Sequence, residues 1–244
     1  MAKWLLTVDT NCADPAQEKE FNAWYDSVNV PAHLQVTGFK RATRYECLRT
    51  ADPRYSLVEG DPKYLALYEI ETENIDATIR EMNELDNLVE ERGRITPFLV
   101  VQRVATYRQI APAYEKPLAA RIAEGGEAEQ PKWLFVVQGI CVDPQQEREF
   151  NHWYDNMHIA DIMEARGFVR ATRYELELVL CDDKPGSEQA RFLAVYEIEA
   201  VDVEDTMAHM RTIGKRLRGG GRMSPLFEHG PTRFYRQLMP PRTK

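Results

Sequence analysis

The stretch GFKRATRYE at positions 38–46 returns, with one residue changed, as GFVRATRYE at positions 167–175. Upstream of it, EFNAWYD at 20–26 returns as EFNHWYD at 149–155. Both matches share an offset of 129 residues, and 23 of the 44 aligned positions that contain them are identical. Identity this dense at a fixed offset indicates a tandem duplication, which has to be recognised before a fold is assigned.

The duplication extends beyond these stretches and sets the expected boundaries. YLALYEIE at 64–71 matches FLAVYEIE at 192–199, and Gly93-Arg94 matches Gly221-Arg222. We therefore expect a first repeat, a linker that contains three prolines and a Gly-Gly pair, and a second repeat. Their boundaries are 1–110, 111–131 and 132–238.

Each copy has the pattern strand, helix, strand, strand, helix, strand. Its first strand is a short apolar run, and an Asp-Pro pair then marks a capped helix start. A glycine stands where that helix should end, and two runs dense in β-forming residues follow. The expected first helices are 15–36 and 144–165, the last strands 95–108 and 223–237, and the variable loops 49–62 and 182–190.

This order is the ferredoxin-like βαββαβ unit, in which both helices cover one face of an antiparallel sheet. The other sheet face still needs cover, which a second copy supplies. The sequence thus predicts an α+β fold: two ferredoxin-like units that pack their antiparallel sheets into a pseudo-dimeric α/β barrel.

Composition excludes several classes of partner. The net charge of −8 argues against nucleic acid and anionic membrane surfaces, which require a basic patch. No apolar run approaches the ~20 residues of a membrane span, and the N-terminus does not resemble a signal peptide. The four cysteines form no C-x-x-C pair. We expect a cytoplasmic protein with reduced thiols.

The two copies differ at positions where the second gains ionisable side chains. Asn29 corresponds to His158 and Ala32 to Asp161. On an ideal helical wheel Asp161 falls within the apolar face and His158 at its edge, near Tyr154. A buried carboxylate needs a partner or a function, and the expected partner here is His158.

The last strand shows the same contrast. Val100-Val101 of the first copy corresponds to Glu228-His229 of the second. Adjacent strand residues point to opposite faces, so one of the pair faces the helices, and the sequence leaves open which one.

These differences predict a site between the helices and the sheet of the second repeat. His158 would act as general base or acid, Asp161 would orient it, and Tyr154 would donate a hydrogen bond to an oxyanion. The expected catalytic residues are His158, Asp161, Tyr154, His229 and Glu228. The expected substrate-binding walls are Trp153, Phe168, Tyr174, Tyr196 and Phe227.

A structural interpretation stands beside the functional one. Trp153 recurs as Trp24 and Tyr154 as Tyr25, which is typical of core residues. A single His–Asp pair on a helix is also more often a structural hydrogen bond than a catalytic pair. The recurrence of Arg170 as Arg41 favours a shared ion-pair ladder over substrate contact.

The pattern E-F-N-x-W-Y-D-x-x-H-x-x-D, followed by Gly167-Phe168, resembles the EthD-like branch of the dimeric α/β-barrel superfamily. The second repeat carries all of it, whereas the first has Asn29 and Ala32 in place of the histidine and the last aspartate. The resemblance implies the fold given above. Its relatives include cofactor-independent monooxygenases, lactone isomerases, polyketide cyclases, haem-binding enzymes and proteins without assigned activity, so it implies no single reaction.

We expect a cofactor-independent enzyme of aromatic compound catabolism, a lyase, isomerase or cyclase. It would move a proton on a small apolar substrate, an aromatic or polycyclic carbonyl or phenolic compound, with no bound metal or other cofactor. One alternative is a non-catalytic ligand-binding or stress-response protein. Another is a metal- or haem-dependent oxygenase in which His158 and His229 would bind metal with a carboxylate. The protein is expected to be a monomeric pseudo-dimer or a homodimer.

Overall fold

The strands and helices follow the predicted order in both repeats of the computed structural model, which describes residues 1–123, 133–183 and 190–244. The long strands of the first repeat are β1 (Ala2–Cys12), β2 (Phe39–Cys47), β3 (Tyr64–Thr72) and β4 (Leu99–Gln109). Those of the second are β6 (Trp133–Cys141), β7 (Phe168–Asp182), β8 (Phe192–Ile198) and β9 (Phe227–Gln237).

The eight long strands close into one antiparallel barrel. Their order is β2-β3-β1-β4-β7-β8-β6-β9, and β9 pairs with β2 to complete the circle. The last strand of each repeat thus pairs with the second strand of the other repeat, since β4 pairs with β7 and β9 with β2. Short extensions strengthen both seams: β5 (Tyr114–Glu115) pairs with β7, and β10 (Arg242–Thr243) with β2. The predicted pseudo-dimeric α/β barrel is confirmed.

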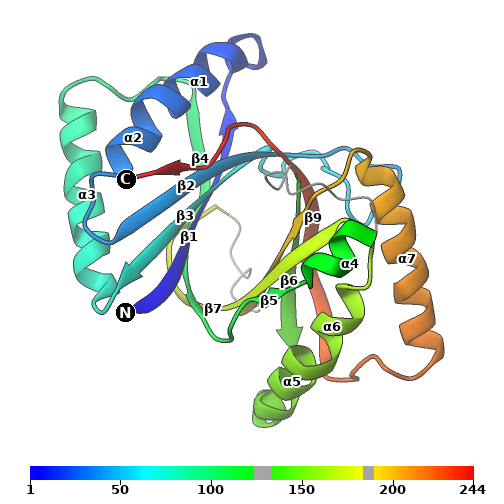
Figure 1. Cartoon of the computed structure of the whole chain (residues 1–244). Coiled ribbons are helices and arrows are strands. Elements are labelled where there is room, and N and C mark those ends of the chain that lie inside the picture. The colour runs from blue at the N-terminus through cyan, green and yellow to red at the C-terminus, as the bar shows by residue number, and fades with distance from the viewer. Residues whose placement is uncertain (124–132, 184–189) are drawn as a thin grey trace.

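The helices cover the barrel from two sides (Figure 1). Those of the first repeat lie on one side and those of the second on the other, with the strands between them. The first repeat has α1 (Glu18–Trp24), α2 (Val30–His33) and α3 (Ile75–Glu91), and the second has α5 (Glu147–Trp153), α6 (Ile159–Ile162) and α7 (Val203–Gly219). The side chains of Asp14 and Asp143 cap their helix starts as expected.

The first helix of each repeat contains a π-helical turn that the sequence did not reveal. These turns span Tyr25–Asn29 and Tyr154–His158. A π turn bonds residue i to i+5, so the side chains after it are rotated relative to a regular α-helix. Met157 is exposed, whereas His158, the last residue of the turn, is buried. The helical segment ends at Ile162, and Gly167 lies in the turn before β7 with a φ of 79°, a conformation that glycine adopts without strain.

Part of the predicted linker is structured. Within 111–131, residues 114–115 form β5 and Leu118–Ala123 form α4. Residues 124–131 lie outside the described residues, as do 184–189 of the loop predicted at 182–190. In the part of the chain that the structure describes, no helix is long and apolar enough to cross a membrane.

Three apolar clusters form the interior. One lies between the helices and sheet of each repeat, and a third fills the barrel. The second repeat's cluster is rich in aromatic side chains and contains Phe150, Trp153, Tyr154, Phe168 and Tyr196. The barrel cluster combines residues of both repeats, among them Leu5, Leu67, Leu134 and Val195.

Candidate functional site

The motif shared by both repeats acts as a clamp on a buried arginine. Arg173, which is 1% exposed, donates hydrogen bonds to Asn151 Oδ1 (2.8 Å) and Asp155 Oδ1 (2.8 Å). Its guanidinium lies 4.1 Å from the ring centroid of Tyr154. In the first repeat, Arg44 makes the equivalent contacts with Asn22, Asp26 and Tyr25. The Asn, Tyr and Asp of E-F-N-x-W-Y-D therefore hold the first helix to the second strand in both repeats.

The tryptophan of the motif is also structural. Trp153 Nε1 donates to the carbonyl oxygen of Arg222 (2.9 Å), and Trp24 Nε1 donates to that of Arg94 (2.7 Å). The bond ties the end of the first helix to the segment before the last strand. Recurrence of the same contact in both repeats matches the structural interpretation of this position.

His158 is the side chain that sets the second repeat apart. It closes the π-helical turn and is 5% exposed. Its imidazole stacks on the indole of Trp153, with ring centroids 4.6 Å apart and planes inclined by 25°. Tyr154 packs edge-on at 4.9 Å and Phe227 at 5.7 Å. The imidazole is thus enclosed by aromatic rings.

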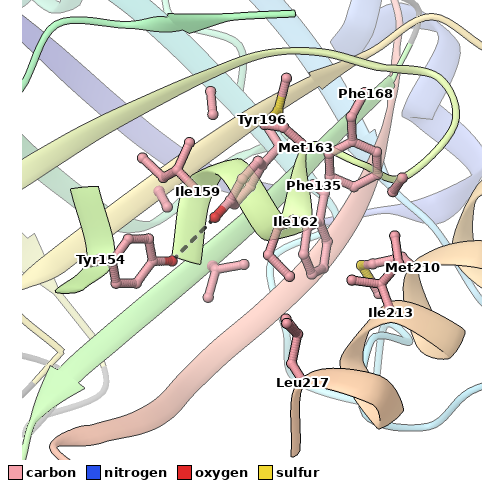
Figure 2. Packing of buried hydrophobic residues seen from close by; sticks show 14 of the residues in the cluster. Phe135, Tyr154, Ile159, Ile162, Met163, Phe168, Tyr196, Met210, Ile213 and Leu217 are labelled. Atoms are coloured by element: carbon pink, nitrogen blue, oxygen red, sulfur yellow. Dashed lines mark hydrogen bonds between the residues drawn. The ribbon is translucent and has the colours of Figure 1, made fainter. Parts of the chain in front are cut away.

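The tyrosine pair behind His158 explains what the Asn29-to-His158 difference does. Tyr154 and Tyr196 point their hydroxyl groups toward one another at 3.4 Å (Figure 2). In the first repeat, Tyr68, the equivalent of Tyr196, is likewise paired with Tyr25, and it also donates to Asn29 Oδ1 at 3.1 Å. In the first repeat, the side-chain amide of Asn29 thus accepts the hydrogen bond of the tyrosine hydroxyl. In the second, Nδ1 of His158 is buried and has no hydrogen-bond partner among the described residues.

Burial governs the protonation of this imidazole. Removal from water, with a smaller contribution from positive charge on His229 and Arg173, lowers the pKa of His158 from 6.5 to about 3. The ring is therefore neutral near pH 7. A buried polar atom without a partner costs about 1–3 kcal/mol, so its persistence calls for an explanation.

The expected orienting contact between Asp161 and His158 is wrong. Asp161 is buried at 7% exposed, but its carboxylate accepts two hydrogen bonds from Arg222, from Nε at 3.0 Å and Nη2 at 2.8 Å. The π turn changes the direction in which Asp161 points relative to a regular α-helix, so that it faces the segment before β9. Arg222 escaped notice because Arg94 occupies the matching position, so the comparison of copies gave no signal there.

The strand register settles which residue of the Glu228-His229 pair faces the helices. Phe227 packs into the helix–sheet cluster, and residues two apart on a strand share a face. His229 therefore lies on the Phe227 side, with ring centroids 4.4 Å apart, and Glu228 on the opposite side. Burial lowers the pKa of His229 as well. The expected role of Glu228 at this site is wrong because of its facing.

Of the expected aromatic wall, Trp153 and Phe227 contact the His158 ring, whereas Phe168 packs against Phe135 and Tyr196 instead. Trp153, Phe168 and Tyr196 belong to the helix–sheet cluster, against which Phe227 packs. Figure 2 shows Phe168 and Tyr196 among side chains of α6 and α7. Tyr174 is elsewhere, because Arg173 points to the helices and the next strand residue must point into the barrel.

The alternative of a metal or haem can be tested on the side chains present. Among the described residues, no three His, Cys, Asp or Glu side chains gather closely enough to hold a metal ion, so His158, His229 and a carboxylate do not form the expected triad. A haem would need an open slot beside His158. Trp153, Tyr154 and Phe227 fill that position at ring distances of 4.6–5.7 Å, and these residues do not fit the group.

Comparison with known proteins identifies the fold and leaves the activity open. No protein-family model and no curated protein matches the chain. A mutant chlorite dismutase from Candidatus Nitrospira defluvii superposes with a TM-score of 0.57 and 12% identity over 98% of this chain and 93% of that one. An anthrone oxidase-like protein superposes with a TM-score of 0.55 and 11% identity over 99% and 93%. The chain therefore has the fold of the dimeric α/β barrels, with both halves in one polypeptide.

Proposed function

We propose that the second repeat is a cofactor-independent proton-transfer enzyme and that His158 is its catalytic base. The observation that carries the proposal is the buried Nδ1 of His158, which has no hydrogen-bond partner in the described residues. The equivalent Asn29 is satisfied by Tyr68, so the fold itself does not require an unpaired group here. A substrate that supplies the missing partner explains its retention.

The surroundings of His158 favour a flat, apolar substrate. Trp153, Tyr154 and Phe227 present ring faces and edges around the imidazole. The imidazole lies beneath Phe227, which is half-buried, and His229, which is exposed, so the proposed substrate displaces the Phe227 ring to reach it. Small-molecule sites combine such apolar walls with few polar groups. Aromatic ketones and phenols match this combination.

The proposed reaction is enolisation. The neutral imidazole of His158 takes a proton from the carbon next to the carbonyl group, and the electron pair of that C–H bond moves to the carbonyl oxygen. The resulting enolate and imidazolium attract each other strongly in a site with few water molecules, which offsets the low basicity of the free imidazole. Return of the proton from the imidazolium to another atom of the substrate completes an isomerisation. In a cyclisation the enolate carbon attacks a second carbonyl carbon of the substrate, and the imidazolium protonates the alkoxide that forms; neither reaction needs an oxidant.

The phenol pair would stabilise the developing oxyanion. Burial raises the pKa values of both Tyr154 and Tyr196, so both hydroxyl groups keep their protons near pH 7 and can donate. Their mutual contact is long at 3.4 Å. A ligand oxygen that accepts a hydrogen bond from Tyr154 would replace a weak contact with a stronger one.

Hydrogen–deuterium exchange tests this proposal without knowledge of the natural substrate. We would incubate the protein in D₂O with 2-tetralone and with anthrone, a choice that follows the aromatic wall and the name of one structural neighbour. The expected result is exchange of the acidic C–H faster than in buffer, abolished by His158→Asn and kept by His152→Asn on the exposed side of the same helix. Equal exchange by wild type and His158→Asn would refute the assignment of His158.

A further inference from the structure

A cavity of about 90 Å³ lies inside the barrel, at the end where β1 and β6 begin. Its lining comes from both repeats in matched pairs, because equivalent residues face each other across the pseudo-two-fold axis of the duplication. The polar pairs are Arg41 and Arg170, Thr43 and Thr172, Tyr45 and Tyr174, and Glu69 and Glu197. This cavity is separate from the His158 site, which lies on the outer, helix-covered face of the sheet.

Each of the two arginines in the cavity has an Nε–H group that makes no hydrogen bond within the part of the chain that the structure describes. Five buried side-chain nitrogen or oxygen atoms in the described residues lack a hydrogen-bond partner, and Nε of Arg41 and Nε of Arg170 are two of them. Each lies near a carboxylate, 3.5 Å from Glu69 and 3.0 Å from Glu115 respectively, but without the alignment of a hydrogen bond. Two positively charged donors are therefore incompletely satisfied at matched positions.

Two of the three carboxylates that line the cavity are already paired; the three are Glu69, Glu71 and Glu197. Glu197 accepts a hydrogen bond from Arg170 Nη1 at 3.2 Å, and Glu69 is the ion-pair partner of Arg41. Burial raises the pKa of Glu197, which weakens its competition as an anion. Burial also raises the pKa values of Tyr45 and Tyr174, so their hydroxyl groups remain protonated and able to donate. The lining carries four cationic side chains, Lys3, Lys40, Arg41 and Arg170, against these three carboxylates, which favours an anionic ligand.

The deeper part of the cavity is apolar. Leu5, Leu67, Leu134 and Val195 line it, and all four belong to the barrel cluster. A ligand therefore needs an apolar body as well as an acceptor group. The volume limits that body: an engineered apolar cavity of about 150 Å³ binds benzene. The smaller cavity here, about 90 Å³, favours a short branched alkyl chain as the apolar body.

We propose that this cavity binds a short-chain aliphatic monocarboxylate on the pseudo-two-fold axis. The carboxylate accepts hydrogen bonds from the guanidinium groups of Arg41 and Arg170, and the alkyl group lies against the apolar floor. Lys3 and Lys40 at the same rim add positive charge. Because the two arginines come from different repeats, only the fused barrel creates the site.

The test uses isobutyrate as the probe and protein with ¹³C-labelled leucine and valine methyl groups. The expected result is a saturable shift of the Leu67, Leu134 and Val195 methyl signals, with isobutyramide and isobutylamine binding at least ten-fold more weakly. Arg170→Gln and Arg41→Gln should each weaken isobutyrate binding at least ten-fold, because a hydrogen bond to a charged group contributes about this much.

The exposed Arg108, paired with Glu175 outside the cavity, provides the matched control: Arg108→Gln should bind isobutyrate like wild type. If the arginine variants lose structure, Arg170→Lys gives a second measurement, since lysine keeps the charge but lacks the paired donors. It should still bind more weakly than wild type. Isobutyramide or isobutylamine binding as tightly as isobutyrate, or unmoved methyl signals at saturating probe, would overturn the inference.

Discussion

The imidazole of His158 stacks on the indole of Trp153 and leaves Nδ1 without a partner, although a tyrosine hydroxyl satisfies the equivalent Asn29. Stacking places the imidazole among apolar rings, and burial there keeps it neutral. The second repeat therefore carries a buried polar atom without a hydrogen-bond partner among the described residues, where the first repeat carries one that is hydrogen-bonded. This difference between two copies of one fold is the basis of the functional proposal.

His158→Asn should stabilise the protein while it removes activity. The asparagine would occupy the place that Asn29 occupies in the first repeat and accept a hydrogen bond from Tyr196, as Asn29 does from Tyr68. We expect a gain of roughly 1 kcal/mol in the free energy of unfolding, because an unpaired buried group is replaced by a bonded one. Urea unfolding of wild type and variant measures it. A clear loss of stability would show that the packing of the His158 ring stabilises the protein by more than its unpaired Nδ1 destabilises it.

The buried His158 should make stability depend on pH in a defined range. Its pKa is about 3 in the folded protein and about 6.5 in the unfolded chain, so between these values only the unfolded state takes up the proton. The stabilising effect is complete above pH 6.5 and is lost as the pH falls toward 3. The loss amounts to up to about 1.4 kcal/mol per pH unit.

Comparison with His158→Asn isolates this contribution, because the carboxylates titrate in both proteins. We expect the free energy of unfolding of wild type to fall more steeply than that of the variant between pH 6.5 and pH 4. Parallel curves would mean that His158 is not buried as a neutral ring.

The Asp161–Arg222 pair should respond unequally to the loss of either member. Asp161→Ala restores the residue found at Ala32 and leaves Arg222, which is 48% exposed along its side chain, free to be hydrated. Arg222→Ala leaves a buried carboxylate unpaired. Thermal unfolding should therefore show a larger fall in Tm for Arg222→Ala than for Asp161→Ala. The reverse order would contradict the burial assigned to Asp161.

The arginine clamp should contribute equally to both repeats. Arg44→Met and Arg173→Met each remove a side chain that is 1% exposed and leave an Asn and an Asp without their partner. We expect losses of roughly 3 kcal/mol for each, measured by denaturant unfolding. A loss confined to Arg173→Met would indicate that the motif serves the second repeat alone.

The sequence predicted the fold well because the duplication supplied an internal alignment. The Asp-Pro caps, the glycine at 167 and the two strand runs all predicted elements that the structure contains. The need to cover both sheets predicted that they pack into a barrel, and the structure adds that β4–β7 and β9–β2 pairing closes it. The local sequence signals for caps, turns and strands were thus consistent with the global requirement that both sheets be covered.

The site was predicted less completely, for two physical reasons. The π-helical turn at Tyr154–His158 rotates the residues that follow, so the wheel paired Asp161 with His158, whereas its partner is Arg222. Strand facing could not be read from the sequence, so Glu228 and Tyr174 were grouped with side chains that lie on the other face of the sheet. His158 itself was found because it differs between copies.

The nuclear magnetic resonance signals of the His158 ring give the most direct test of the central claim. With ¹⁵N-labelled histidine, we would follow Nδ1 of His158 while 2-tetralone or anthrone is added at neutral pH. The account predicts that ligand binding moves the Nδ1 signal of His158 strongly, because the ligand supplies the missing partner, and leaves that of His152 unchanged. Saturable binding or turnover of the ligand with no change at His158 Nδ1 would contradict it.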